Sequence, residues 1–261
     1  MSSRQNPLIK GARKLLRRKH REETGQFLLE GPKALEEVVA AGCPPGILFY
    51  LPTIDERQLV PFQDWQLVKT APQVFQTISD TTTSQGLIGL LEKPRATLDQ
   101  VLSPKGTLWL ILDGIQDPGN MGTMLRTAVA AGCHGVILTK GTVDPFNPKA
   151  ARASAGALYR IPLVSQVDPW ELVEACERAK IPLLGTAPRA PKSYFDIDLR
   201  SPVAIVIGNE GQGMGEELAS QAELVHIPQA PGLDSLNAAV AAGVLLYEVI
   251  RQRRGESPAL Y

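Results

Sequence analysis

The sequence predicts an α/β protein with a mostly parallel sheet, and three observations support this fold class. Unbroken apolar runs such as 108–112 have the composition of strands that are buried on both faces. From residue 107 onward, these runs alternate with segments whose apolar residues follow a helical spacing, as in a sheet covered by helices on both sides. With 261 residues, 44% of them hydrophobic, the chain has enough material for one large or two smaller domains.

Residues 1–91 predict a small α/β domain of their own. A short basic helix is expected after Asn6-Pro7, because Asn caps free N–H groups and Pro suits the first helical position. A second helix is expected over 32–41, ending at Gly42. The other expected elements are strands at 27–29, 47–51, 65–69 and 86–91 and a short helix at 74–78.

The polar segment 93–97 breaks this pattern and is the expected linker, which gives domains at 1–95 and 106–261. In the second domain, strands are expected at 108–112, 135–139, 161–164, 181–185, 203–207 and 223–227, and helices at 120–131, 149–157, 169–179 and 235–252. Parallel sheets bind ligands at the carboxyl ends of their strands. The loops that follow these strands are therefore the expected location of a site.

The charge distribution indicates a basic N-terminal arm. The formal net charge is zero, yet residues 1–21 carry eight Lys or Arg and no acid, which leaves 19 basic against 27 acidic residues in the remainder. Such an asymmetry fits an arm that binds a polyanion, and it equally fits a solvated helix face.

Cysteine and histidine usage argues against a metal site and for a reducing compartment. Cys43, Cys133 and Cys176 are widely separated without a Cys-x-x-Cys pair, and the three His residues are isolated. No apolar run reaches the length of a membrane span. The N-terminus lacks the apolar core of a secretory signal, although its Arg-rich, acid-free composition can imitate a mitochondrial transit peptide. We expect a cytoplasmic protein without a membrane or metal partner.

Two loops after apolar strands carry polar and charged residues of the kind that bind ligands or take part in catalysis. In the first, 113–126, Asn120 opens a helix and Arg126 can lean back toward the helix N-terminus, where an anion would sit. A capping Asn and a surface Arg fit the same pattern. In the second, 205–214, glycines surround Asn209 and Glu210 in an order that matches neither a Walker loop nor a dinucleotide fingerprint. This loop can cradle a nucleotide, or it is only a turn.

A third segment, 227–237, places Ser235 and Asn237 at the start of the last helix, where Ser235 can also be a plain N-cap. The small residues at 238–243 allow close helix packing, either within the domain or between subunits.

In order and spacing, these three segments resemble the SpoU (TrmH-type) 2′-O-ribose RNA methyltransferases of the SPOUT superfamily, over residues 107–253. Residues 1–91, with the sequences at 3–7 and 27–31, look like the small ribosomal-protein-like RNA substrate-binding domain of that family. The resemblance implies a C-terminal trefoil knot, S-adenosyl-L-methionine (AdoMet) as cofactor, a homodimer, no metal, and an RNA substrate, either rRNA or tRNA.

The resemblance also implies roles for individual residues. Arg126 and Asn120 act at the ribose, Arg126 as a base or as a clamp for phosphate and oxyanion, while Glu210, Ser235 and Asn237 shape the pocket. The residues expected to bind the cofactor are Gly208, Ile227, Leu236, Thr186, Ala187, Asn209, Gly211 and Gln229. Two positions depart from the family pattern: Gln229 stands where Met is usual, and Pro231 where Gly is usual.

Two other functions compete with this interpretation. The first is a catalytically inactive RNA- or ribosome-binding factor, against which the retained Asn120, Arg126, Glu210 and Asn237 speak. The second is a dinucleotide-dependent enzyme on a doubly wound sheet, which the order of the glycines disfavours.

Overall fold

The computed structural model describes residues 1, 3–231 and 235–254, and the chain folds into two compact units. Unit 1 contains Met1–Pro94 together with Asp144–Arg160, and unit 2 contains Arg95–Val143 and Ile161–Tyr261. The segment 93–97, expected as a linker, has no regular secondary structure. Residues 144–160, which lie inside the range expected for the second domain, pack with the first unit instead.

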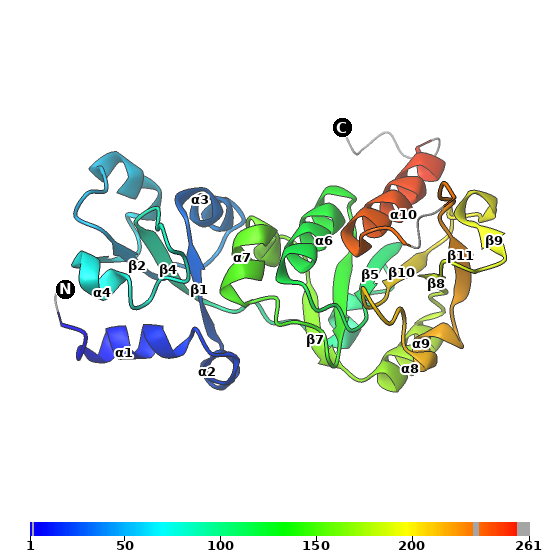
Figure 1. Cartoon of the computed structure of the whole chain (residues 1–261), viewed down its shortest axis with the longest axis horizontal. Coiled ribbons are helices and arrows are strands. Elements are labelled where there is room, and N and C mark those ends of the chain that lie inside the picture. Colours follow the sequence, from blue (N-terminus) through cyan, green and yellow to red (C-terminus); the bar gives the residue numbers. More distant parts are fainter. Residues whose placement is uncertain (2, 232–234, 255–261) are drawn as a thin grey trace. The chain divides into compact units, whose positions relative to one another are not determined.

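Unit 1 is built on a four-stranded sheet in the order β1-β4-β2-β3, in which β2 and β3 are parallel and the other pairs antiparallel (Figure 1). Its elements are α1 (Pro7–Lys14), α2 (Arg18–Thr24), β1 (Gln26–Glu30), α3 (Pro32–Ala40), β2 (Ile47–Tyr50), η1 (Glu56–Phe62), β3 (Gln66–Lys69), α4 (Pro72–Phe75), β4 (Leu87–Glu92), α7 (Pro148–Ser154) and η2 (Ala157–Tyr159).

Helix α1 belongs to the core of unit 1. Asn6 caps it by accepting a hydrogen bond from the N–H of Leu8. Ile9 and Ala12 are buried in the cluster that contains Phe49 and Phe75. The positively charged N-terminal segment is therefore a packed helix whose charged face points outward, because its apolar face is used in the core.

The segment 144–160 is held in unit 1 by aromatic packing and by a buried ion pair. Phe146 packs edge-on against Phe27 of β1, with 5.1 Å between ring centroids. Asp144 pairs with Arg21 of α2 at 2.6 Å, and the Arg21 side chain also donates to the carbonyl of Leu15. Both charged side chains are less than a tenth exposed. Arg21 is thus a structural residue rather than a free cation of a basic arm.

Unit 2 carries a seven-stranded sheet in the order β7-β6-β5-β10-β8-β11-β9, in which every pair of neighbouring strands is parallel. The fold class expected for this part, α/β with a mostly parallel sheet, is confirmed. Its strands are β5 (Leu108–Leu112), β6 (Gly135–Thr139), β7 (Leu163–Val167), β8 (Leu183–Thr186), β9 (Lys192–Ser193), β10 (Val203–Ile207) and β11 (Glu223–His226).

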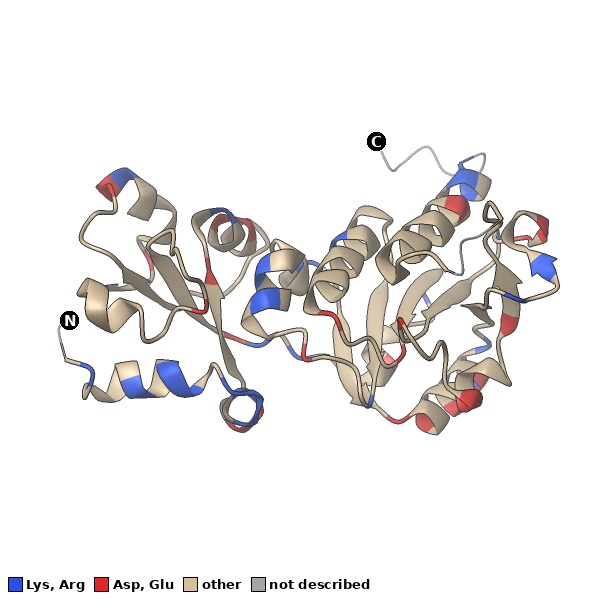
Figure 2. Cartoon of the chain, in the orientation of Figure 1, with Lys and Arg blue, Asp and Glu red and all other residues tan. Residues whose placement is uncertain are grey.

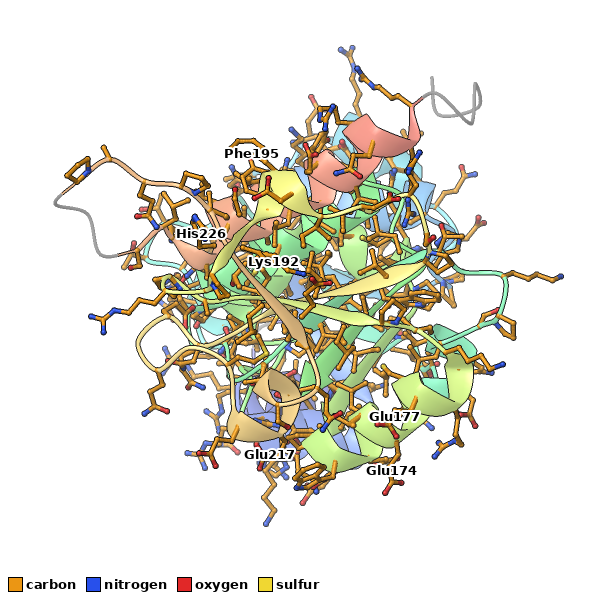
Figure 3. All side chains as sticks on the ribbon, turned by 90° about the vertical axis from the view of Figure 1, so that its right-hand side faces the viewer. Glu174, Glu177, Lys192, Phe195, Glu217 and His226 are labelled. Atoms are coloured by element: carbon orange, nitrogen blue, oxygen red, sulfur yellow. The ribbon has the colours of Figure 1, made fainter. Side chains whose placement is uncertain are left out.

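Helices cover both faces of this sheet (Figure 1). The helical segments of unit 2 are α5 (Leu98–Val101), α6 (Pro118–Ala130), α8 (Pro169–Ala179), η3 (Tyr194–Asp196), α9 (Glu216–Ala219) and α10 (Ala238–Arg253). Side chains of α5, α8 and α9 share one apolar core with β5, β6 and β10, and α10 packs against α6 on the other face. Figure 3 views the β9 end of the sheet, where Lys192 and His226 mark β9 and β11 and Glu177 and Glu217 mark α8 and α9.

Two helix starts differ from the sequence expectation. Helix α6 begins at Pro118 rather than at Asn120, because the Asp117 side chain accepts a hydrogen bond from the Asn120 N–H and is the cap. Helix α10 begins at Ala238, and its cap is Asn237 rather than Ser235. Residues 232–234, which belong to the third motif, lie outside the described residues.

The buried ion pair predicts a large difference between two arginines of α2. Replacing Arg21 by Ala leaves Asp144 buried without its partner, and we expect a loss of about 3–5 kcal/mol of stability. Arg18→Ala is the matched control: its pair with Glu22 is exposed, so the loss should stay below about 1 kcal/mol. Urea unfolding followed by circular dichroism measures both, and equal losses would contradict the structural role of Arg21.

Candidate active site

A buried carboxylate at the end of β5 organises the loops at the carboxyl edge of the unit 2 sheet. The Asp113 side chain accepts a hydrogen bond from the hydroxyl of Thr139 at 2.7 Å and another from the N–H of Gly215 at 2.8 Å. Thr139 ends β6, and Gly215 follows the loop after β10. Asp113 therefore connects the ends of the neighbouring strands β5 and β6 to the segment that follows the loop after β10.

The loop after β10 folds back on itself. Asn209 and Gly213 exchange two backbone hydrogen bonds of 2.8 and 2.9 Å. The Asn209 side chain accepts from the N–H groups of Gly211 and Gln212 and donates to the carbonyl of Gly114 at 2.7 Å. Asn209 thus holds the shape of the loop and attaches it to the loop after β5.

The fold-back leaves no room for a side chain at position 208. A Cβ on Gly208 would lie 2.3 Å from the backbone nitrogen of Met214 and 2.4 Å from the carbonyl carbon of Gly213. The glycine is required for this close backbone approach.

A cavity of about 420 Å³ opens beside this loop. It is lined by Thr186, Ala187, Pro188, Ile207, Gly208, Asn209, Glu210, Gly211, Gln212, Gly213, Val225, Ile227, Gln229, Ser235, Leu236, Ala238 and Ala241. The volume and the mixture of backbone, apolar and few polar groups suit a small-molecule ligand. All eight residues expected to bind a cofactor, and also Glu210 and Ser235, line this one cavity.

A chain of hydrogen bonds connects the three sequence motifs. The Asn237 amide donates to the side-chain oxygen of Asn120 at 3.0 Å, and the Asn120 amide donates to the Glu210 carboxylate, also at 3.0 Å. The backbone N–H groups of Gln116 and Asp117 also donate hydrogen bonds to this carboxylate, at 3.2 and 3.3 Å. Residues that are more than a hundred positions apart in the sequence therefore share one polar network.

These contacts keep Glu210 anionic. Burial raises its pKa, but the hydrogen bonds from the Asn120 amide and from backbone N–H groups outweigh burial, so the pKa lies below the ordinary glutamate value. Glu210 sits at the N-terminus of α6, where the helix dipole also favours negative charge. A carboxylate engaged by several donors is a positioning group rather than a free base.

Arg126 lies on the exposed side of α6. Its side chain forms neither a hydrogen bond nor an ion pair with another of the described residues. Its guanidinium is therefore available to an anionic ligand. Ser235 is exposed at the edge of the cavity.

Sequence reasoning overlooked the residues that support the site. Asp113 was part of a recognised motif without a role, and Thr139 was only the end of a strand. Their position at the carboxyl ends of neighbouring parallel strands was the available signal. Within the described residues, no group of His, Cys, Asp and Glu side chains could hold a metal ion. In the same part of the chain, no helix has both the length and the apolarity of a membrane span.

Two protein-family models match the chain. The model of the SpoU rRNA methylase family matches residues 107–247, and the model of the MRM3-like substrate binding domain matches residues 6–89. The first match contains all three sequence motifs, and the second lies within unit 1.

Individual relatives agree with these matches. A Synechocystis protein named as an uncharacterised tRNA/rRNA methyltransferase is 36% identical, over 97% of this chain and 94% of its own. The 23S rRNA (guanosine(2553)-2′-O)-methyltransferase RlmP of Bacillus subtilis is 32% identical, over 95% of this chain and 98% of its own. The SpoU methyltransferase AviRb of Streptomyces viridochromogenes, solved in complex with AdoMet, superposes with a TM-score of 0.88 at 29% identity, over 97% of this chain and 100% of that one.

The fold-back of the loop predicts that Gly208 and Gly211, two of the three glycines that line the cavity, differ in their tolerance of a side chain. Gly208→Ala forces backbone atoms apart and should lower stability by about 1–3 kcal/mol. Gly211→Ala is the matched control, because its Cβ would meet only Asn209 Oδ1 at 3.6 Å, an ordinary contact. Its effect should stay within about 0.5 kcal/mol. Thermal unfolding of both variants is the measurement, and equal stabilities would refute the tight approach at Gly208.

Proposed function

Because the chain belongs to the SpoU rRNA methylase family, we propose that it is an AdoMet-dependent methyltransferase that methylates a ribose 2′-hydroxyl of rRNA. The observation that carries the proposal is the hydrogen-bonded chain Asn237–Asn120–Glu210 beside the cavity. It links the three sequence motifs of unit 2 at the place where a parallel sheet binds its ligands.

The cavity fits AdoMet by its lining. Gly208 and Gly211 bring backbone N–H and carbonyl groups close to a ligand, while Ile227 and Leu236 supply apolar surface. Gln229 also lines the cavity. When bound, AdoMet supplies an electrophilic methyl group. Thr186, Ala187 and Asn209 complete the cofactor-binding set that we propose.

Arg126 acts on the RNA. Its planar guanidinium binds the phosphate next to the reacting ribose and stabilises negative charge on the 2′-oxygen. A guanidinium stays protonated in proteins and is a poor base, so we assign Arg126 the role of a clamp. Asn120, Asn237 and Glu210 position the ribose, and Ser235 closes the edge of the pocket.

Unit 1 binds the RNA through the outer face of α1. Lys10, Arg13 and Lys14 on this helix are exposed, and so is Arg17 just beyond its end. Figure 2 shows the basic residues along α1. Arg18 and Arg21 are excluded from this face, because each is already paired with a carboxylate. Phosphates of a structured RNA are the expected partners of such a surface.

Three further features complete the proposal. The catalytic unit contains a trefoil knot near its C-terminus, in the region where the loop after β10 is folded back and tied to Asp113. The enzyme works as a homodimer, and it works in the cytoplasm. Ala238, Ala239, Ala241 and Ala242 of α10 are buried within the chain, where they allow close packing of this helix, and the exposed Val240 is available for the dimer contact.

The function is tested with the full-length protein, labelled AdoMet, and separate rRNA and tRNA substrates. We expect label in rRNA at one ribose, identified as an alkali-resistant linkage. Label in tRNA alone would mean that the substrate is tRNA and not rRNA. Absence of label in both, with intact RNA binding, would favour an inactive binding factor.

Arg126→Ala should lower the single-turnover rate of methyl transfer about 100- to 1000-fold, the usual effect of removing a positioned charge-stabilising donor. Arg126→Lys should rescue little, since an ammonium does not reproduce the planar fork. Cofactor affinity should be unchanged, and Arg178→Ala, an exposed helical arginine of the same unit, is the matched control. A near-normal rate in Arg126→Ala would remove this residue from the catalytic set.

Neutralising the outer face of α1 should weaken RNA binding and flatten its salt dependence. Each lost contact lowers the slope by roughly 0.7 to 0.9, because fewer counterions are released. The test variant replaces Lys10, Arg13 and Arg17 by Gln, and the control variant replaces Lys33, Arg57 and Lys69, which are exposed elsewhere in unit 1. Binding curves at several salt concentrations distinguish them, and equal slopes would mean that the charge on α1 is only a solvated face.

A further inference from the structure

The side chain of Gln116 connects two loops at the carboxyl edge of the unit 2 sheet. Its amide nitrogen donates to the carbonyl of Gly114 at 2.9 Å, in the loop after β5, and to the carbonyl of Gly141 at 2.7 Å, in the loop after β6. The bond to Gly114 is local, whereas Gly141 lies 25 residues further along the chain. The amide therefore closes the turn after β5 and fastens it to the neighbouring loop.

These two bonds fix the orientation of the amide. An NH2 group has two hydrogens, which match the two carbonyl acceptors. In the reverse orientation the side-chain oxygen would face both carbonyl oxygens with no proton between them, and the two bonds would be lost. Gln116 is thus a donor toward both loops, and a side chain of similar length without an N–H group cannot replace it.

The backbone of the same residue holds the carboxylate of the polar network. The N–H groups of Gln116 and Asp117 donate to the two different oxygens of Glu210, at 3.2 and 3.3 Å. Both distances are at the upper end of the usual range for such bonds. A small displacement of the segment 114–117 is therefore enough to break them.

Such a displacement does not stop at the carboxylate. Glu210 also accepts from the Asn120 amide, and the Asn120 oxygen accepts from Asn237. In a connected network, the position of each member depends on that of its neighbours. The bridge made by Gln116 thus supports the side chains to which we assign the placement of the ribose, although it lies outside the lining of the cavity.

We propose that Gln116 is a positioning residue for methyl transfer: its amide holds the segment 114–117 in the conformation whose two backbone N–H groups bind Glu210. The inference rests on the proposed function, in which Glu210 helps to position the ribose. The effect of Gln116 passes through this carboxylate and not through a contact with the RNA or the cofactor. Its loss therefore slows the methyl-transfer step and leaves both binding affinities nearly unchanged.

The first test measures single-turnover methyl transfer by full-length Gln116→Met on the rRNA that the native protein labels. Methionine has a similar length but no donor, and we expect a roughly 10-fold lower rate at saturating RNA and AdoMet. The affinities for rRNA and for S-adenosylhomocysteine should change by less than about twofold. Gln116→Glu, which turns oxygens toward the same two carbonyls, should be at least as slow. Gln221→Met, an exposed residue outside the cavity, is the matched control and should keep the native rate.

A double-mutant cycle decides whether Gln116 acts through Glu210. In the background of Glu210→Ala there is no carboxylate left to displace, so Gln116→Met should lower the rate by less than about twofold. The side-chain oxygen of Gln116 has no hydrogen-bond partner among the described residues, and it could contact the RNA directly. In that case the roughly 10-fold loss would recur in both backgrounds, and the inference would be overturned.

The remaining outcomes are equally clear. A native rate in Gln116→Met would show that the bridge is dispensable, and a loss of RNA affinity alone would make Gln116 an RNA contact. A lower thermal midpoint with a parallel loss of both affinities would make it a merely structural residue. Each of these results overturns the inference while the native protein still methylates rRNA. Absence of methyl transfer by the native protein would overturn the proposed function together with the inference.

Discussion

The site depends on one buried carboxylate. Asp113 stands at the end of a fully buried strand and receives hydrogen bonds from Thr139 and from the backbone of Gly215. Both partners are needed, since a buried carboxylate with too few donors is strongly destabilising. The requirement fixes the loop after β10 against the ends of β5 and β6. The positions of Asn209, Glu210 and the cavity follow from that attachment.

The polar network adds a second level of order. Glu210 is held by donors from the first motif, and Asn120 passes the connection on to Asn237, which also caps α10. Each amide uses its donor in one direction and its acceptor in the other, so the network has a single consistent orientation. Connected networks of this kind rigidify a site when every member is satisfied. A pocket shaped in this way needs little rearrangement when a ligand enters.

Much of this arrangement could be predicted from the sequence, and the reasons for the rest are physical. The bounds of β5, β6, β10 and α8 agree with the expectation, because apolar runs and helical periodicity are local signals. The cap of α6 was misassigned to Asn120, since Asp117 caps equally well and only its geometry decides. The burial of Arg21 was not predictable, because its partner Asp144 lies 123 residues away. The sequence predicts a helix at 149–157, where the structure has α7 (Pro148–Ser154), but it does not predict which unit this helix joins.

The placement of 144–160 in unit 1 has a consequence during synthesis on the ribosome. The N-terminal unit cannot complete its core when residue 94 emerges, because Phe146 and Asp144, the partners of Phe27 and Arg21, have not yet been made. Translation at about 5–20 residues per second leaves an interval of several seconds before residue 160 follows. During that interval Arg21 lacks its ion-pair partner, and Phe27 lacks the ring against which it packs. The N-terminal unit therefore completes its folding only after residues 95–143 of the other unit have been synthesised.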